Sequence, residues 1–311
     1  MKWWHILLVV LAAVAVIPAV LWGHRDIPLE VLKQKYANAD SRFINIEGMP
    51  VHYRVEGNMA DSIPLLLLHG TGASLHTWDA WTEKMKSSKK IIRMDLPAFG
   101  LTGPAPSRDY TPEMFQRVVI TLLDSLKVPL VDIAGNSLGG RIAWYTALRH
   151  PDRVRKLILI DAVGYPLNKS SQPIAFKLAA IPVINKVLTF ITPRSVVEST
   201  LLNLYSDDTK VTENLVDRYY ELALRPGNRQ AFIDRARPFD GDSTYIRIPT
   251  ITQPTLILWG EEDYFVPLSI AKQFARDLPH DTLVVVPRCG HMPMEELPEE
   301  TATLALDFLK K

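Results

Sequence analysis

The sequence predicts an α/β fold with a mainly parallel central sheet, helices on both faces and an inserted helical segment. Apolar runs typical of buried strands alternate with helical patterns over residues 42–163, and the strand pattern resumes at 254–260 and 282–286. Between these parts, residues 164–247 contain no strand-like run and show helical periodicity, as at 211–224. Strands that alternate with helices are typical of parallel sheets, because a crossover helix returns the chain to the same edge.

The chain is expected to divide into four parts. These are an apolar N-terminal segment at 1–25, a linker at 26–41, an α/β core made of 42–163 and 248–311, and a helical cap at 164–247. The linker is polar and expected to be helical over 27–39. The core is expected to begin with paired strands at 42–47 and 51–55, joined by a turn at Gly48-Met49-Pro50.

Composition describes a folded protein and argues against several function classes. Of 311 residues, 47% are apolar and 22% are charged, which suits one large domain with an insertion. Lys and Arg number 35 against 34 acidic residues, so no excess of positive charge attracts nucleic acid. The single cysteine, Cys289, cannot form a disulfide within the chain. The eight histidines lack metal-ligand spacing, so we expect no metal; the oligomeric state stays open.

The N-terminus predicts a membrane anchor. Residues 3–22 are apolar apart from His5, and 20 residues of helix are about 30 Å long, the thickness of a bilayer core. We expect an uncleaved single transmembrane helix with the catalytic domain on the outer, periplasmic or extracytoplasmic, side. A cleaved signal peptide is the alternative. Lys2 before the run and Arg25 and Lys33 after it leave the orientation poorly determined.

Ser137 is a candidate nucleophile. It follows an apolar strand pattern at 131–136 and precedes a helical pattern at 138–150, and Gly135 and Gly139 stand two residues to either side. This strand–serine–helix arrangement is typical of a nucleophile elbow, in which small neighbours allow the sharp turn that exposes the hydroxyl. The predicted elbow comprises Gly135, Asn136, Ser137 and Gly139.

A serine hydroxyl needs a histidine base and an acid that orients it, and candidates for both follow downstream strands. The strand at 254–260 is followed by Glu261-Glu262-Asp263, and the strand at 282–286 leads to Cys289-Gly290-His291. In a parallel sheet these loops leave the same edge as the Ser137 turn. The chain order of serine, acid and histidine is the one found in α/β-hydrolases.

Through these motifs, the chain from Arg42 to its C-terminus resembles an α/β-hydrolase fold esterase or lipase. The further pieces that carry the resemblance are Leu65-Leu66-Leu67-Leu68-His69-Gly70-Thr71-Gly72, Asp95-Leu96-Pro97-Ala98-Phe99-Gly100 and Gly290-His291-Met292-Pro293. The resemblance implies that Asp263 is the triad acid and that the backbone N–H groups of Thr71 and Leu138 form the oxyanion hole. Glu261 and Glu262 are rivals for the acid, and Asp161 after the strand at 156–160 is a more distant one.

The resemblance implies a serine hydrolase that cleaves a small carboxylic ester, hydrophobic or lipid-like, through an acyl-enzyme intermediate. The alternative is a carbon–carbon bond hydrolase of the meta-cleavage product type, which the chain resembles at 135–140. Several of those enzymes have tryptophan after the catalytic histidine, where Met292 stands here. An alternative of another class is a non-catalytic, membrane-anchored binding protein. Epoxide hydrolases and haloalkane dehalogenases are disfavoured, because their nucleophile is an aspartate and Ser137 occupies its place.

No cofactor is expected. The stretch Gly70-Thr71-Gly72 follows a strand, and Asp95 ends the next one, which imitates part of a dinucleotide-binding unit. Leu75 stands where that fingerprint requires its third glycine, and no phosphate-binding G-x-x-x-x-G-K-[ST] run occurs. We expect His69, before these glycines, to shape the loop.

Overall fold

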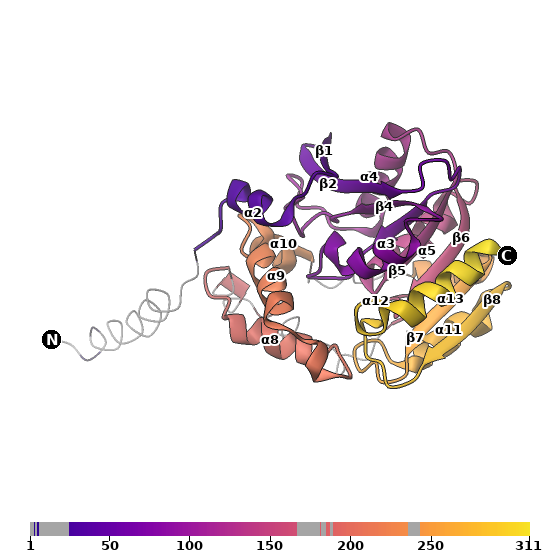
Figure 1. Cartoon of the computed structure of the whole chain (residues 1–311). Coiled ribbons are helices and arrows are strands. Elements are labelled where there is room, and N and C mark those ends of the chain that lie inside the picture. Colours follow the sequence, from indigo (N-terminus) through magenta and orange to yellow (C-terminus); the bar gives the residue numbers. More distant parts are fainter. Residues whose placement is uncertain are drawn as a thin grey trace.

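The computed structural model describes residues 25–166, 189–235 and 243–311, together with the isolated positions Trp3, His5, Ile181, Asn185 and Lys186. Within these residues the chain forms one eight-stranded sheet with strand order β1-β2-β4-β3-β5-β6-β7-β8 (Figure 1). The strands are β1 (Ser41–Ile46), β2 (Met49–Gly57), β3 (Leu65–Leu68), β4 (Lys90–Met94), β5 (Val131–Asn136), β6 (Val154–Ile160), β7 (Thr255–Gly260) and β8 (Asp281–Val286).

Only β2 pairs antiparallel with its neighbours, and the six strands from β4 to β8 in the sheet order are parallel. The predicted mainly parallel sheet is therefore confirmed. Parallel strands all present their carboxyl ends at one edge, so the loops after β3, β5, β6, β7 and β8 gather there.

The first hairpin is tighter than predicted. Met49 and Pro50 belong to β2 and pair with Ile46 and Asn45, so the predicted three-residue turn is wrong. The turn consists of Glu47 and Gly48, both with positive φ, at 49° and 80°. Two residues of positive φ match the twist of an antiparallel hairpin, and Pro50 fits near the start of the strand.

Helices cover both faces of the sheet. One face packs on α4 (Pro112–Ser125), α5 (Leu138–Arg149) and α11 (Leu268–Asp277), and the other on α3 (Asp79–Met85) and α13 (Pro298–Lys310). Side chains alternate between the faces, as the strand period of two requires: Leu66 and Leu68 of β3 join the first core, and Leu65 and Leu67 the second. The sheet is thus buried on both sides, which explains its continuous apolar runs.

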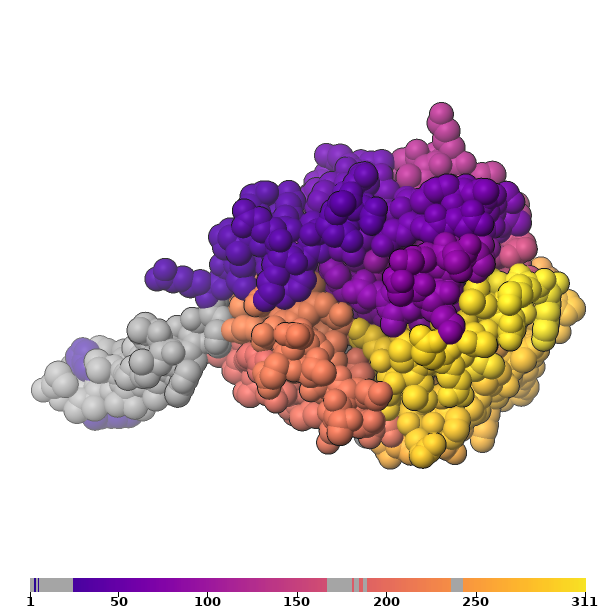
Figure 2. All heavy atoms as spheres, in the orientation of Figure 1, coloured from indigo at the N-terminus to yellow at the C-terminus, as the bar shows by residue number. Residues whose placement is uncertain are grey.

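Between β6 and β7 the described residues form helices and no strand. These are α8 (Arg194–Leu202), the 3-10 turn η3 (Asp208–Lys210), α9 (Glu213–Ala223), α10 (Asn228–Arg235) and the 3-10 turn η4 (Thr244–Thr250). Figure 2 shows the α8–α10 segment, in orange, between the indigo N-terminal part and the yellow C-terminal part.

The linker helix α2 (Leu29–Tyr36) packs against this helical segment. Tyr36 Oη donates to Glu221 Oε2 of α9 at 2.7 Å, and Lys35 Nζ binds the same carboxylate at 2.7 Å. The backbone N–H of Ile27 also donates to Leu224 O at 2.9 Å. The helix predicted over 27–39 is shorter than expected and spans Leu29–Tyr36. Pro28 precedes its first turn, and Ala37 after it is already extended.

The predicted membrane localisation is corrected. Among the described residues the longest helix is α4, with 14 residues, or about 21 Å, against roughly 30 Å of bilayer core. Nowhere in the described part of the chain does a helix have the length and apolar character needed to cross a membrane. The run at 3–22, on which the predicted anchor and its orientation depended, lies outside the described residues except for Trp3 and His5.

Candidate active site

Ser137 lies on a strained turn at the carboxyl end of β5. Its φ of 53° and ψ of −112° place it in a region that non-glycine residues rarely adopt, and it caps the N-terminus of α5. The turn requires glycines around it. A Cβ atom added to Gly135 would lie 2.2 Å from Gly139 O, and one added to Gly139 would lie 2.1 Å from Leu68 O. The elbow pattern thus corresponds to close backbone approaches between β5, α5 and β3.

His291 and Asp263 are hydrogen-bonded in a nearly buried position. His291 Nδ1 lies 2.7 Å from Asp263 Oδ2, and each residue is 5% exposed. Asp263 Oδ1 accepts two more hydrogen bonds, from the N–H groups of Phe265 at 2.7 Å and Val266 at 3.0 Å. The carboxylate, held by its own loop, fixes the tautomer in which Nδ1 donates and Nε2 can take up a proton.

Asn136 ties the nucleophile turn to the histidine loop. Its side chain is fully buried, and Nδ2 donates to His291 O at 3.0 Å and to Ile160 O at 3.3 Å. The residue that precedes Ser137 is therefore bonded to the backbone of the candidate base, 155 positions away. The structure brings the loops after β5, β6 and β8 together at one edge.

The loop after β3 passes directly against Ser137. A Cβ atom on Gly70 would lie 3.2 Å from Ser137 Cβ and 2.7 Å from Asn136 Oδ1. Thr71 follows in this loop, and Leu138 opens α5, where the first N–H groups of a helix have no partner within it. Both predicted oxyanion donors thus belong to segments that border the nucleophile.

His69 shapes this loop from inside the protein. It is fully buried, Nε2 accepts the Leu96 N–H at 2.9 Å, and Nδ1 donates to Gly70 O at 2.7 Å. Burial lowers the pKa of His69, which keeps the ring neutral so that it can accept and donate at once.

The rival acids lie elsewhere. Glu261 is exposed, and Glu262 bonds Ser206 Oγ through its carboxylate. Asp161 is fully buried, and its carboxyl oxygens lie within 4.8 Å of ligand-type atoms of Asp263 and His291. Of the four acids weighed from the sequence, Asp263 is the one hydrogen-bonded to the imidazole in the described contacts.

That group of three is also where the described residues come closest to a metal-binding arrangement. Within this group His291 Nδ1 is hydrogen-bonded to Asp263 Oδ2, so we assign the group to hydrogen bonding.

Glu296 is a functional candidate that sequence reasoning missed. It lies on α12 (Pro293–Glu296), is 1% exposed, and its carboxylate accepts the N–H groups of Gly290, Ser206 and Asp207, each at 3.0 Å. The backbone N–H of His291 also donates to Leu204 O at 2.7 Å. The segment between α8 and α9 is therefore fastened to the histidine loop, partly through one carboxylate.

Arg141 and Arg235 lie on helices that border the candidate site. Arg141 lies one turn into α5, where its N–H donates to Ser137 O at 3.1 Å. Arg235, at the end of α10, is 5.9 Å from the Phe99 ring centroid, and that ring packs on His69. Burial, and next the charge of Arg141, lower the pKa of Arg235 to about 10. The two guanidinium groups are therefore close enough for the charge of one to affect the other.

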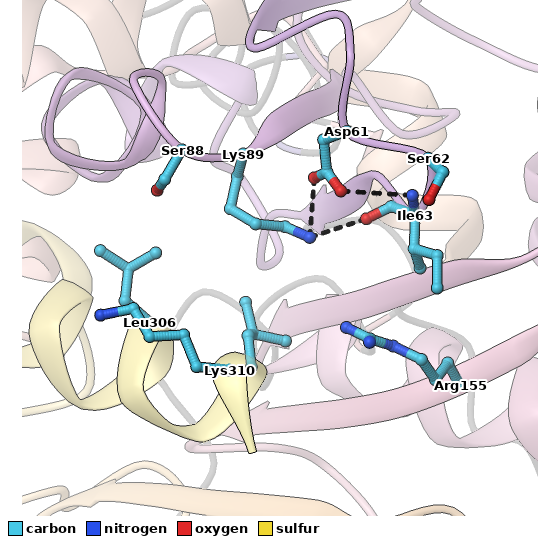
Figure 3. A pocket seen from close by; sticks show the side chains of 9 residues that line it. Asp61, Ser62, Ile63, Ser88, Lys89, Arg155, Leu306 and Lys310 are labelled. Atoms are coloured by element: carbon cyan, nitrogen blue, oxygen red, sulfur yellow. Dashed lines mark hydrogen bonds and ion pairs between the residues drawn. The ribbon is translucent and has the colours of Figure 1, made fainter.

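A surface pocket of about 280 Å³ lies at the opposite edge of the sheet. Figure 3 shows it between the segment before β3, with Asp61, the start of β6, with Arg155, and α13, with Lys310. Lys89 Nζ, in its wall, binds Asp61 Oδ2 at 2.7 Å and Ile63 O at 2.7 Å. Asp61 and Lys89 precede β3 and β4, and Arg155 lies at the start of β6, whereas the candidate catalytic residues follow their strands, so the pocket is not part of the candidate active site.

Comparison with known proteins identifies the family of this fold. The sequence profile of the alpha/beta hydrolase fold matches residues 63–298. The chain is 30% identical over 268 residues to a 2-hydroxymuconate semialdehyde hydrolase of Pseudomonas sp. (strain CF600), covering 82% of this chain and 90% of that protein.

Two similar solved structures carry different activities in their descriptions. A meta-cleavage product hydrolase from Pseudomonas fluorescens IP01 has a TM-score of 0.75 at 26% identity, covering 88% of this chain and 99% of that one. A structure described as a membrane phospholipase A has a TM-score of 0.74 at 27% identity, covering 100% of this chain and 98% of that one.

Proposed function

The chain belongs to the alpha/beta hydrolase fold family, and on that premise we propose that it is a serine hydrolase of carbon–carbon bonds in meta-cleavage products. The observation that carries the substrate class is the 30% identity to a 2-hydroxymuconate semialdehyde hydrolase across 90% of that protein. This was the alternative from the sequence; the ester hydrolase expected first has the general support of the fold and of one similar structure, and we place it second.

The proposed reaction uses Ser137, His291 and Asp263 as a triad. His291 Nε2 takes the Ser137 proton as the oxygen attacks the ketone or aldehyde carbon of the substrate, and Asp263 stabilises the resulting imidazolium through Nδ1. The backbone N–H groups of Thr71 and Leu138 bind the oxyanion, a role worth about 3 kcal/mol of barrier for each donor.

Collapse of the intermediate breaks the carbon–carbon bond. The substrate reacts as its 2-oxo tautomer, in which the carbon next to the attacked carbonyl is saturated, so the electron pair of the broken bond delocalises into a dienolate. The dienolate receives the proton from His291, and the acyl group stays on Ser137. A water molecule, deprotonated by His291, then attacks the acyl carbon and releases the carboxylic acid and free Ser137. Atoms and charge balance with water as the only other reactant.

We propose that the segment 164–247 acts as a cap that shapes the pocket over Ser137 and excludes water.

A second candidate is ester hydrolysis, favoured by the phospholipase A structure that aligns with 100% of this chain. The same triad and oxyanion donors serve an ester, with an alkoxide in place of the dienolate as leaving group. Met292, where several carbon–carbon hydrolases have tryptophan, is compatible with this alternative.

A substrate panel distinguishes the two. Purified protein is assayed on 2-hydroxymuconate semialdehyde, on 2-hydroxy-6-oxohepta-2,4-dienoate, on p-nitrophenyl esters of increasing chain length and on phospholipid micelles, each with Ser137→Ala as control. We expect kcat/KM for a dienoate to exceed that for every ester by at least about 100-fold, or about 2.7 kcal/mol. Higher kcat/KM on esters or phospholipid would replace the proposal with the second candidate.

A further inference from the structure

A second carboxyl group is buried beside the proposed triad. Asp161 follows β6 with a positive φ of 44°, is fully buried, and accepts the Gly260 N–H at 3.0 Å through Oδ1. Its carboxyl group lies within 4.8 Å of both the Asp263 carboxylate and the His291 ring nitrogen. The proposed mechanism assigns no role to this group.

Two ionised carboxylates do not fit this position. Asp263 already accepts hydrogen bonds at both oxygens, from His291 through Oδ2 and from Phe265 and Val266 through Oδ1. Asp161 Oδ2 has no donor among the described residues, although it is buried. Two acceptors cannot hydrogen-bond each other unless one of them carries a proton.

We infer that Asp161 carries a proton in the folded enzyme and donates it in a hydrogen bond to Asp263, which makes Asp161 a fourth, positioning member of the proposed triad. The proton removes the unpaired oxygen and gives Asp263 a fourth donor. The two carboxyl groups together then carry one negative charge, which balances the positive charge of the His291 imidazolium.

The surroundings support a neutral Asp161. Burial, and next the charge of Asp263, raise the pKa of Asp161 well above its usual value. Glu296 of α12 also faces it and acts in the same direction. Cys289 lies near both, and burial raises the pKa of its thiol, so it adds no charge. Among these groups no cation other than protonated His291 would favour the ionised form.

The inference rests on the proposed roles of His291 and Asp263, but its main test needs no turnover. The titration of the His291 ring is followed by NMR in the parent and in Asp161→Asn, whose amide can donate to Asp263 and accept from Gly260 N–H. If Asp161 is protonated, the midpoint moves by less than about 0.5 pH unit. If Asp161 is ionised, removing a negative charge at this distance lowers the midpoint by about 1–3 units, which would overturn the inference.

A matched control removes a carboxylate from the same edge of the sheet. Glu261 is exposed and lies two residues before Asp263. Glu261→Gln is expected to move the His291 midpoint by less than about 0.3 unit, because solvent screens an exposed charge. This control gives the size of a general electrostatic effect.

Positioning is tested on the substrate that the panel identifies. Asp161→Leu keeps the side chain branched at Cγ but cannot donate, and we expect kcat to fall about 10-fold or more with KM changed less than about 3-fold. Asp161→Asn should restore kcat to within about 3-fold of the parent. Equal losses in both variants would refute the hydrogen-bonding role.

If neither variant folds, the parent protein still decides the matter. Carbon-13 labelling of the aspartate carboxyl groups reports whether Asp161 has the shift of a carboxylic acid or of a carboxylate at pH 7. A protonated shift supports the inference, and an ionised one overturns it. If the panel shows no carbon–carbon cleavage, the proposed substrate fails, while the NMR results on Asp161 keep their meaning.

Discussion

Replacing Glu296 with alanine should loosen the contact between the histidine loop and the α8–α9 segment. The carboxylate is 1% exposed and accepts the N–H groups of Gly290, Ser206 and Asp207, each at 3.0 Å. The substitution leaves the buried Gly290 N–H and two part-buried N–H groups without this partner, at about 1–3 kcal/mol for the buried donor and less for donors that water can reach. We expect a loss of about 2–4 kcal/mol, a large part of the roughly 5–15 kcal/mol typical of a folded domain.

The assay is urea unfolding at pH 7.5 in the parent, Glu296→Ala and Glu296→Gln. Glutamine keeps one oxygen as an acceptor, so its loss should be about 1–2 kcal/mol. Because Gly290 adjoins His291, kcat/KM should also fall, by about 10-fold or more in Glu296→Ala. Glu300→Ala, an exposed residue four positions further on, serves as control and should unfold within about 0.5 kcal/mol of the parent. If Glu296→Ala unfolds within 1 kcal/mol of the parent and keeps its turnover, the carboxylate does not fasten these segments.

Three further predictions concern the catalytic edge and the core. Asp263→Asn should lower kcat by about 10³–10⁴-fold with little change in the free energy of unfolding, because the amide can favour the wrong His291 tautomer. A loss of kcat under about 10-fold would exclude Asp263 as the acid. Gly139→Ala should destabilise the fold by at least about 2 kcal/mol, because the added Cβ would lie 2.1 Å from Leu68 O. The control Gly72→Ala, with a φ of 77° and open space around it, should cost only about 1 kcal/mol. Equal losses of stability in chemical unfolding would refute the clash. Burial lowers the pKa of His76 from 6.5 to about 4, so the stability that depends on a neutral His76 is present above pH 6.5 and is lost as the pH falls toward 4. Between pH 8 and 5 the free energy of unfolding, measured in urea, should fall by about 2 kcal/mol from this cause. His76→Gln should remove that part of the pH dependence.

The local features of the site could be predicted from the sequence because each depends on a few neighbouring residues. The elbow pattern places Ser137 between β5 and α5, and the apolar runs before Asp263 and His291 are the strands β7 and β8. Parallel strands then bring their following loops to one edge without any knowledge of side-chain contacts. The choice of Asp263 over Glu261 and Glu262 depended on family resemblance, and the hydrogen bond to His291 is consistent with it.

Long-range pairings could not be predicted in the same way. Glu296 lies in a Met-Glu-Glu run that resembles an ordinary exposed helix start, and its partners Ser206 and Asp207 are 90 and 89 positions away. Asp161 was considered only as a rival acid, because nothing in the pattern after β6 indicates that its carboxyl group faces that of Asp263. Asp161 is buried and lies close to Asp263 only because β6 and β7 are neighbours in the folded sheet.

The remaining errors have separate physical reasons. The turn of the first hairpin was predicted one residue too long, because Glu47 and Gly48 alone make the turn and Met49 and Pro50 already pair with β1. The predicted membrane localisation depended on hydropathy at 3–22 alone, and no helix among the described residues has the required length and apolar character.

The central claim is that Ser137 is a nucleophile activated by His291, and covalent labelling tests it most directly. The protein is treated with a fluorophosphonate, digested, and the adduct is located by mass spectrometry in the parent, in Ser137→Ala and in His291→Ala. We predict a single adduct on Ser137 in the parent, none in Ser137→Ala, and labelling slowed by at least about 100-fold in His291→Ala. An adduct on another residue, or unchanged labelling without His291, would contradict the account.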